Sequence, residues 1–308
     1  MITSFFKVSK PYHYVLFLLG LTVVFLHQFY HQTYLIKAVG FFEIIIKFLS
    51  LLVSVFFVVF TITKNNLTQN NSFAAFYFCL FIFLFPQAIT KAEVVISNMF
   101  ILLSYRRILS LGRRTNFKKK YFDAGIWLFI ATLFYPMTAF FIIPILSSII
   151  IWEMDAFKHL VAIFLGPFML ICISKLIYII FNISIPEINF EFKMIDYEFL
   201  HSIELEFKTI SIIFFSFILF STLMIFKKVI LKSSQKKSLF MILFLMCLTS
   251  FAIIFMSVNY APSNFLFSFF PAAIVVANFT QSRKLYWISD IFILVMLVVY
   301  STSFIINL

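Results

Sequence analysis

Long apolar runs separated by short polar stretches dominate the chain from one end to the other. Runs such as Ile212–Phe220 and Ile291–Tyr300 are mostly apolar and lack the strict alternation of a half-buried strand, which indicates helices. About 20 apolar residues of helix are needed to cross a bilayer. The pattern therefore predicts an all-α, polytopic integral membrane bundle of about 10–11 transmembrane or re-entrant helices, with a cytoplasmic N-terminus.

The expected segments are placed by apolar run and oriented by the Lys and Arg residues between them. They cover residues 14–30, 41–62, 72–89, 94–105, 122–135, 137–152, 159–182, 209–226, 238–258, 264–279 and 285–307. We expect a single integral membrane domain over residues 1–308, because the sequence shows no internal repeat and no appended soluble domain.

Two of these segments have unusual lengths for a membrane span. The apolar run 94–105 is too short to cross alone and leads straight into Arg106 and Arg107. The stretch 121–152 is too long for one span and holds Pro136 near its middle, where a proline kinks or breaks a helix. We expect a tight hairpin around Pro136 that does not fully cross the membrane.

Charge gives the orientation and excludes several classes of protein. Apolar residues make up 63% of the chain and charged residues 12%, which excludes an ordinary soluble domain. The net charge of +12 comes from short loops, most densely at 106–120, as in cytoplasmic loops of membrane proteins. That segment is the expected basic cytoplasmic loop, and no nucleic-acid partner is expected. Half of the 12 acidic residues lie in 183–207, the expected acidic external loop.

Several stretches resemble an uncharacterised family of polytopic inner-membrane proteins from flavobacteria and their relatives. The resemblance is carried by the opening MITSFFKVSKPYHY, by NMFILLSYRRILSL at Asn98–Leu111 and by KKKYFDAGIWLFIATLFYP at Lys118–Pro136. It covers most of the chain and implies a bacterial inner membrane. The family has no known function, so it implies no catalytic residue.

Glu43 and Lys47 form one candidate site near the outer end of the second segment. They are four residues apart with the acid first, which is the favourable order for an ion pair on one helix face. A structural pair is the simpler interpretation, because pairing lowers the cost of two charges in lipid. Glu43 is also the candidate catalytic residue, as a general base at the external face.

Lys175, Arg106 and Arg107 are candidate residues for binding a lipid head group or substrate. Lys175 lies inside an apolar run, about 10 Å from its outer end, where its side chain either snorkels or faces a cavity. Arg106 and Arg107 open the densest basic stretch, which serves topology and attraction to anionic lipid, or binds a phosphate bidentately.

Tyr135 completes the candidate binding residues because it precedes Pro136, and broken helices at membrane depth often line substrate cavities. No cofactor and no metal site are expected. His27 and His31 are four apart, but the other three histidines lie elsewhere along the chain. The three cysteines, Cys79, Cys172 and Cys247, lack the spacing of a metal or redox motif.

These features favour an inner-membrane component of envelope biogenesis that handles a lipid-linked sugar or polymer. The short middle helices and the basic segment resemble parts of multi-helix membrane glycosyltransferases. The expected partners are membrane lipids, a polyprenyl-phosphate-linked substrate and other envelope proteins. Two alternatives stay open: a non-enzymatic subunit of a secretion, gliding or export assembly, and a small-molecule transporter, although no paired broken helices recur in a second half.

Overall fold

The structure is a computed structural model of an all-α protein, and it describes residues 2–35, 41–152, 155–182, 205–229, 234–256, 262–281 and 286–306. After the short α1 (Ile2–Phe5), these residues contain helices at all eleven positions that the sequence predicts. They are α2 (Pro11–Leu35), α3 (Phe41–Asn65), α4 (Phe73–Leu84), α5 (Ala92–Leu109), α6 (Phe117–Phe134), α7 (Ile142–Ile151), α8 (Ala156–Phe181), α10 (Leu205–Val229), α11 (Ser234–Met256), α12 (Leu266–Thr280) and α13 (Tyr286–Ile306).

Seven of the described helical segments are long and apolar enough to cross a membrane, which makes this a multi-pass membrane protein. One of them is Ala92–Arg113, where the apolar run alone is too short to cross. The helix is longer than that run because Arg106 and Arg107 lie in its last turn. Phe73–Leu84, Pro136–Ile151 and Trp287–Ser301 are shorter apolar helices.

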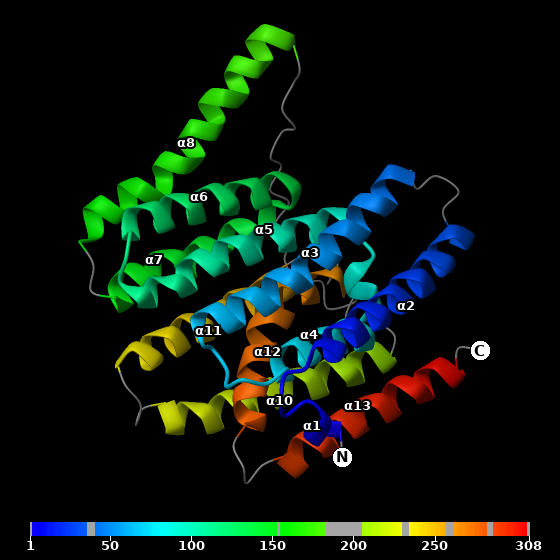
Figure 1. Ribbon diagram of the computed structural model, residues 1–308. Helices are drawn as coiled ribbons and strands as arrows, with labels where there is room; N and C mark the ends of the chain where they lie inside the picture. The colour runs from blue at the N-terminus through cyan, green and yellow to red at the C-terminus, as the bar shows by residue number, and fades with distance from the viewer. Residues whose placement is uncertain are drawn as a thin grey trace.

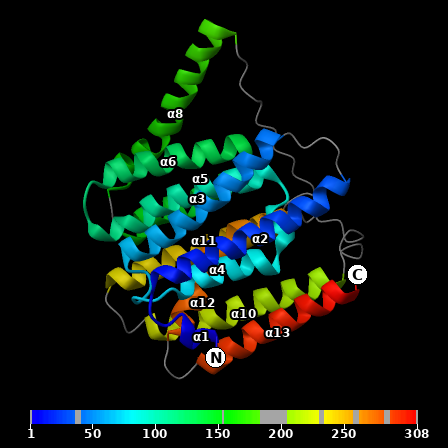
Figure 2. The same ribbon diagram turned by 45° about the vertical axis from the view of Figure 1, so that its right-hand side comes forward.

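Most of the long helices lie side by side, whereas α12 crosses them steeply in the middle of the molecule and α8 projects away from them (Figures 1 and 2). Its segment Pro262–Thr280 is 94% buried, so α12 forms the centre of the core. Aromatic rings surround its first turns: Phe269 lies 5.9 Å from Phe81 of α4 and 5.9 Å from Phe214 of α10. Rings at such centroid distances attract one another in addition to burying apolar area, so they tie α4 and α10 to α12.

Two serines on α5 hold α6 in register. The Ser97 hydroxyl donates to the Ala131 carbonyl at 2.9 Å, and the Ser104 hydroxyl donates to the Ala124 carbonyl at 3.0 Å. Both pairs are buried, and each partner is seven residues from its counterpart, which places all four on one antiparallel seam. Small side chains on both helices let the backbones approach closely, as is common between membrane helices.

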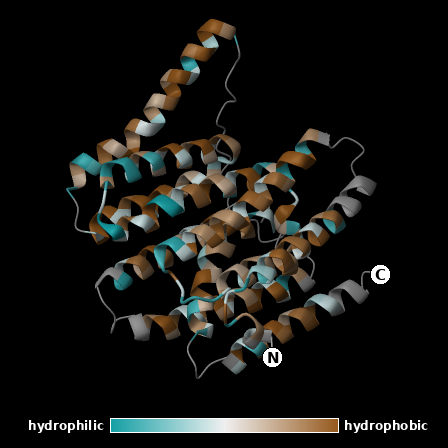
Figure 3. Ribbon diagram, in the orientation of Figure 1, coloured by the Kyte–Doolittle hydropathy of each residue, from teal (hydrophilic) through white to brown (hydrophobic). Residues whose placement is uncertain are grey.

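Two glycines form the crossing of α6 and α8. A side chain at Gly125 would collide with the Ile163 carbonyl, and one at Gly166 would meet the Ile126 side chain and the Phe122 carbonyl. Pro167 lies inside α8 and has no N–H, so the Ile163 carbonyl lacks its usual donor within the helix. That carbonyl rests on Gly125 instead. Beyond this crossing α8 leaves the bundle (Figure 1), and most of its residues are hydrophobic (Figure 3).

Three 3-10 turns that begin at proline break the bundle on one side: η1 (Pro86–Ile89), η3 (Pro136–Phe141) and η5 (Pro262–Phe265). The break at Pro136 confirms the predicted split into two helices, here α6 and α7. With 18 residues, α6 is about 27 Å long and nearly matches a bilayer core. The hairpin is therefore deeper than expected on its first arm, while α7 has only 10 residues.

Contacts between distant segments define the opposite end of the bundle, which we call the basic end. The Thr3 N–H donates to Asp290 at 3.0 Å, and Ser72 lies 2.9 Å from His13 Nδ1. The first contact joins α1 to the beginning of α13, and the second joins the beginning of α2 to the beginning of α4. The Arg113 guanidinium donates to the Lys64 carbonyl, which adds the last turn of α3 and the turn after α5.

Candidate functional site

An aromatic ring at the basic end carries two cations. Phe60 and Lys64 are one turn apart near the end of α3, and the Lys64 ammonium lies 4.9 Å from the Phe60 ring centroid. The Arg106 guanidinium of α5 lies 4.6 Å from the same centroid. The two positive charges are therefore within about one Debye length, roughly 10 Å at 0.1 M salt, and repel each other. Attraction to the face of the ring offsets part of that repulsion.

A third cation joins from η2 (Ser110–Arg113). The Arg113 guanidinium donates to the Lys64 carbonyl, one of the terminal carbonyls at the end of α3. Cations favour this position because the C-terminus of a helix carries a partial negative charge of about −0.5. Three full positive charges exceed that partial charge. We name Phe60, Lys64, Arg106 and Arg113 the Phe60 cluster.

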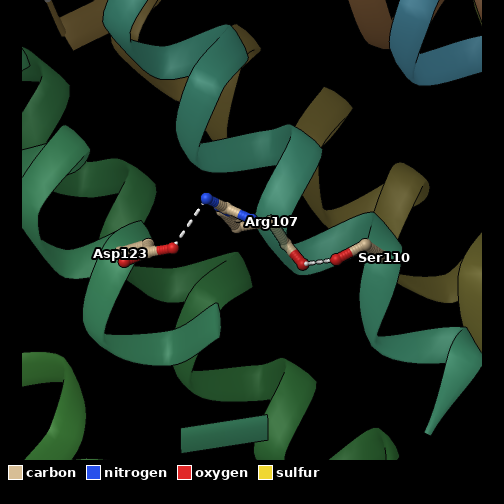
Figure 4. Close-up of polar contacts among 3 residues, drawn as sticks. All are labelled: Arg107, Ser110 and Asp123. Atoms are coloured by element: carbon tan, nitrogen blue, oxygen red, sulfur yellow. Dashed lines mark hydrogen bonds and ion pairs between the residues drawn. The ribbon is translucent and has the colours of Figure 1, made fainter. Parts of the chain in front are cut away.

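Arg107 has a different environment from its neighbour. Its guanidinium forms an ion pair with Asp123 of α6 at 2.8 Å, and its carbonyl accepts a hydrogen bond from the Ser110 hydroxyl at 2.7 Å (Figure 4). The two charged side chains are about one-third exposed. Asp123 thus neutralises Arg107 and joins α5 to α6. The Arg106 guanidinium lies over the Phe60 ring and forms no hydrogen bond with the side chains and carbonyls that the structure describes.

Lys120 supports the same corner from the first turn of α6. Its side chain is buried, and its ammonium donates to the Ser110 carbonyl at 2.7 Å. This bond satisfies a carbonyl at the end of α5, where the intrahelical donors run out. The predicted basic loop 106–120 is therefore mostly ordered helix: the last turn of α5, then η2, then the first turn of α6.

A cavity of about 220 Å³ lies at the same end of the bundle as the Phe60 cluster, although none of the four cluster residues lines it. Asn66, two residues after Lys64, lines it together with Lys236 of α11 and Asn278 of α12. Its other lining residues are Leu67, Thr68, Gln69, Leu239, Phe240, Leu243 and Gln281. Gln281 accepts from the Gln69 N–H at 3.3 Å, so part of the polar lining is held in place by the protein itself.

The structure does not bring all the predicted site residues together. Arg106 and Arg107 lie at the basic end, whereas Glu43 is in the first turn of α3. Phe60 and Lys64 are near its other end, so about 26 Å of helix separates Glu43 from Phe60 and about 32 Å separates it from Lys64. Tyr135 lies at the Pro136 break, on the side away from the basic end. Lys175 is exposed on α8.

The expected pair of Glu43 and Lys47 has an asymmetric environment. The Lys47 side chain is 5% exposed and its ammonium donates to the Thr90 carbonyl at 3.2 Å. Glu43 is exposed. Lys47 thus stabilises the end of η1, one of the three breaks. No group of three or more His, Cys, Asp or Glu side chains within the described ranges is placed to hold a metal ion.

Three members of the site are absent from the sequence-based candidates: Phe60, Lys64 and Arg113. The sequence does contain one indication that Lys64 belongs with the basic stretch: both are expected on the same side of the membrane. Nothing in the spacing of residues 60 and 106 indicates that they meet. The predicted acidic loop 183–207 lies outside the described residues except for its last three positions, which belong to α10.

Comparison with known protein families assigns the chain to one of them. Residues 5–307 match the model of a family of unknown function, DUF6427, so the chain belongs to that family over nearly its whole length. No curated protein and no solved structure matches it.

Proposed function

We propose that this protein binds the phosphate-bearing head group of a lipid or lipid-linked precursor at its basic end. The observation that carries the proposal is the Phe60 cluster, which gathers three cations and leaves the Arg106 N–H groups without a protein acceptor among the described residues. An anion placed between these cations would relieve their mutual repulsion. Arginine suits phosphate because its planar guanidinium donates two parallel hydrogen bonds.

The position of the cluster supports a membrane lipid as the source of the phosphate. Lys64 and Arg113 end two segments that are long enough to cross the bilayer, Phe42–Asn65 and Ala92–Arg113. The ends of such segments lie at the level of lipid head groups. The cavity of about 220 Å³ at the same end of the bundle is below the usual range of about 300–1,000 Å³ for whole ligands, and suits part of a head group.

We extend the proposal to a role in envelope biogenesis at the bacterial inner membrane, where lipid-linked sugars and polymers are assembled. The concentration of Lys and Arg at one end supports a cytoplasmic orientation of that end. Glu43 as a catalytic base does not fit a reaction at the Phe60 cluster, because it lies at the other end of α3. Binding and presentation of the lipid is the function that this geometry favours.

The test uses the full-length protein reconstituted with phosphatidylglycerol and then examined by native mass spectrometry. We expect Arg106→Ala to lower the occupancy of the bound lipid at least tenfold, and Arg106→Lys to restore little of it because the bidentate geometry is lost. Arg107→Ala should reduce occupancy much less, since Asp123 already neutralises Arg107.

Lys158→Ala is the matched control, because it also removes one positive charge near the basic end. Lys158 is exposed and pairs with Asp155 at 2.9 Å. The hydrogen bond from Lys158 lowers the pKa of the Asp155 carboxyl, so the pair exists at neutral pH and is lost only in acid. Equal loss of lipid in Lys158→Ala and Arg106→Ala would show that the loss of one positive charge explains the effect, whichever residue carries it. That result would contradict the proposal.

A specific observation also favours the second candidate function, a subunit of a membrane assembly. Only 11% of the Ala156–Phe181 span is buried, far less than in the other candidate spans. Cys172 is exposed on this helix, so it reports on neighbours directly. A disulfide-linked or cross-linked partner at Cys172 in native membranes would support this function. A monomer that carries phospholipid alone would oppose it.

A further inference from the structure

A large apolar groove lies on the other half of the bundle, away from the Phe60 cluster. It has a volume of about 690 Å³ and lies between α2, the end of α4 and α13. Its walls are Val23, Val24, Phe83, Pro86, Leu294, Leu297 and Val298, and its polar lining residues are His27, Tyr300 and Ser301. Several of the wall residues are more than half exposed, so the groove opens at the lipid-facing surface.

The polar residues gather at one end of this groove. Both α2 and α13 begin at the basic end, where Thr3 bonds to Asp290. Counted from those starts at 1.5 Å per residue, Leu294 lies about 12 Å along α13 and Val23 about 18 Å along α2. Ser301 lies about 22 Å along α13 and His27 about 24 Å along α2. The groove is thus apolar toward the membrane centre and polar toward the outer face.

This gradient matches the polarity of one kind of molecule. An amphiphile of the outer leaflet has its hydrocarbon chain toward the bilayer centre and its head group at the surface. Tyr300 adds an amphipathic ring near the polar end, where aromatic residues are common in membrane proteins. Its ring also packs on Phe83 at 5.1 Å, which joins α13 to α4 on one wall of the groove.

We propose that this groove is a binding site for a single hydrocarbon chain of an outer-leaflet phospholipid, with the head group beside His27 and Ser301. The volume falls within the range of about 300–1,000 Å³ that is typical of ligand pockets. The site is independent of the Phe60 cluster, because the two lie at opposite depths in the membrane. It accounts for the opening that the lining residues leave between α2, α4 and α13.

The groove can be filled without disturbing the core. Val298 is 57% exposed and Leu294 is 53% exposed, so Val298→Trp and Leu294→Trp place a large ring in the groove alone. Ile180→Trp is the matched control, because Ile180 is an exposed apolar residue of α8 that does not line the groove. All three are made in the Arg106→Ala protein, so that lipid at the basic end does not contribute.

Each full-length variant is reconstituted in phosphatidylethanolamine and phosphatidylglycerol vesicles, extracted in mild detergent and analysed by native mass spectrometry. We expect one retained phospholipid in the parent and in Ile180→Trp, and at least fivefold lower occupancy in both groove variants. Unchanged occupancy in the groove variants, or equal loss in Ile180→Trp, would overturn the proposal. If Arg106→Ala did not lower lipid occupancy, the proposed site at the basic end would be contradicted. The comparison of the groove variants with Ile180→Trp would still test the groove.

A second measurement tests the orientation of the lipid. Phosphatidylglycerol with a diazirine at the end of one acyl chain is photolysed on the reconstituted protein, and the adducts are mapped by mass spectrometry. We expect adducts on Leu294, Phe83 or Val23. Adducts confined to Ser301 and His27 would show the reverse orientation and contradict the proposal.

Discussion

Adjacent residues in a helix point in directions that differ by about 100°, and for this reason Arg106 and Arg107 have different partners. Arg107 turns to α6 and meets Asp123, whereas Arg106 turns to α3 and lies over Phe60. The sequence predicts both as head-group ligands because they are the same type of residue, next to each other in the same basic stretch. Only the packing of α5 between α3 and α6 separates a structural arginine from one that is available to a ligand.

Lys47 gives a prediction at the same scale. Lys47→Met keeps a long side chain but removes the hydrogen bond from the Lys47 ammonium to the Thr90 carbonyl. A hydrogen bond that involves a charged group contributes about 1.5–3 kcal/mol, so we expect a lower free energy of unfolding by about that amount. Thermal unfolding in detergent measures the change.

Glu43→Gln is the control for this prediction. Glu43 is on the same helix, one turn earlier, but is exposed, so its substitution should change stability by less than about 0.5 kcal/mol. If both variants were equally destabilised, the ion pair expected from the sequence would explain the data better than the bond to Thr90.

At the scale of helices, the crossing of α6 and α8 depends on residues whose importance the sequence does not signal. The chain has only 5 glycines, and this scarcity weakens any expectation of close helix contacts from composition. Two of them, Gly125 and Gly166, nevertheless lie at this one crossing. Because α8 is otherwise little buried, the crossing supplies much of the contact that holds its first half to the bundle.

Gly125→Ala should therefore weaken the protein although alanine is the better helix former. Its Cβ would collide with the Ile163 backbone, and overpacking of this kind costs about 1–3 kcal/mol. Gly20→Ala is the matched control, since nothing lies within 4 Å of a side chain added at Gly20. It should be neutral or stabilising by up to about 1 kcal/mol. Loss of stability in both variants alike would contradict the close crossing.

The seam between α5 and α6 yields a second prediction about helix packing. Ser97→Ala and Ser104→Ala each remove one interhelical hydrogen bond, and such bonds in membrane proteins contribute about 0.6 kcal/mol on average. The two sites are about 10 Å apart along α5, so the effects should add in the double variant. Unfolding of the single and double variants in one detergent tests this, and a double variant as stable as the parent would contradict the seam.

The sequence predicts the eleven helices well because a span is recognised by its length and apolarity, which need no knowledge of neighbours. It wrongly predicts that the segment at 94–105 is too short to cross the membrane. The two arginines at the end of this run are counted as loop, although they continue α5. The contacts that specify packing are shared between segments far apart in the chain, such as Phe60 with Arg106. Periodicity within one segment cannot indicate which distant segment covers it.

On the scale of the whole molecule, the two ends of the bundle differ in charge, and this difference predicts orientation. The basic end holds Lys64, Arg106, Arg107, Arg113 and Lys120, and the positive-inside rule predicts that this end faces the cytoplasm. Lys118→Cys marks that end, and Lys91→Cys marks the other. Both positions are exposed, and both variants lose one positive charge, so they are matched.

We expect a membrane-impermeant maleimide to label Lys91→Cys in intact cells and Lys118→Cys only after the membrane is opened. Cys172 is exposed and is replaced by Ser in both proteins, whereas Cys247 is buried and Cys79 is half-buried. The reverse pattern would place the Phe60 cluster on the external surface. It would also move the apolar groove to the cytoplasmic leaflet, so both of the proposed lipid sites would exchange leaflets. Orientation therefore decides which lipids each site can reach, and this labelling comes before any search for the lipid itself.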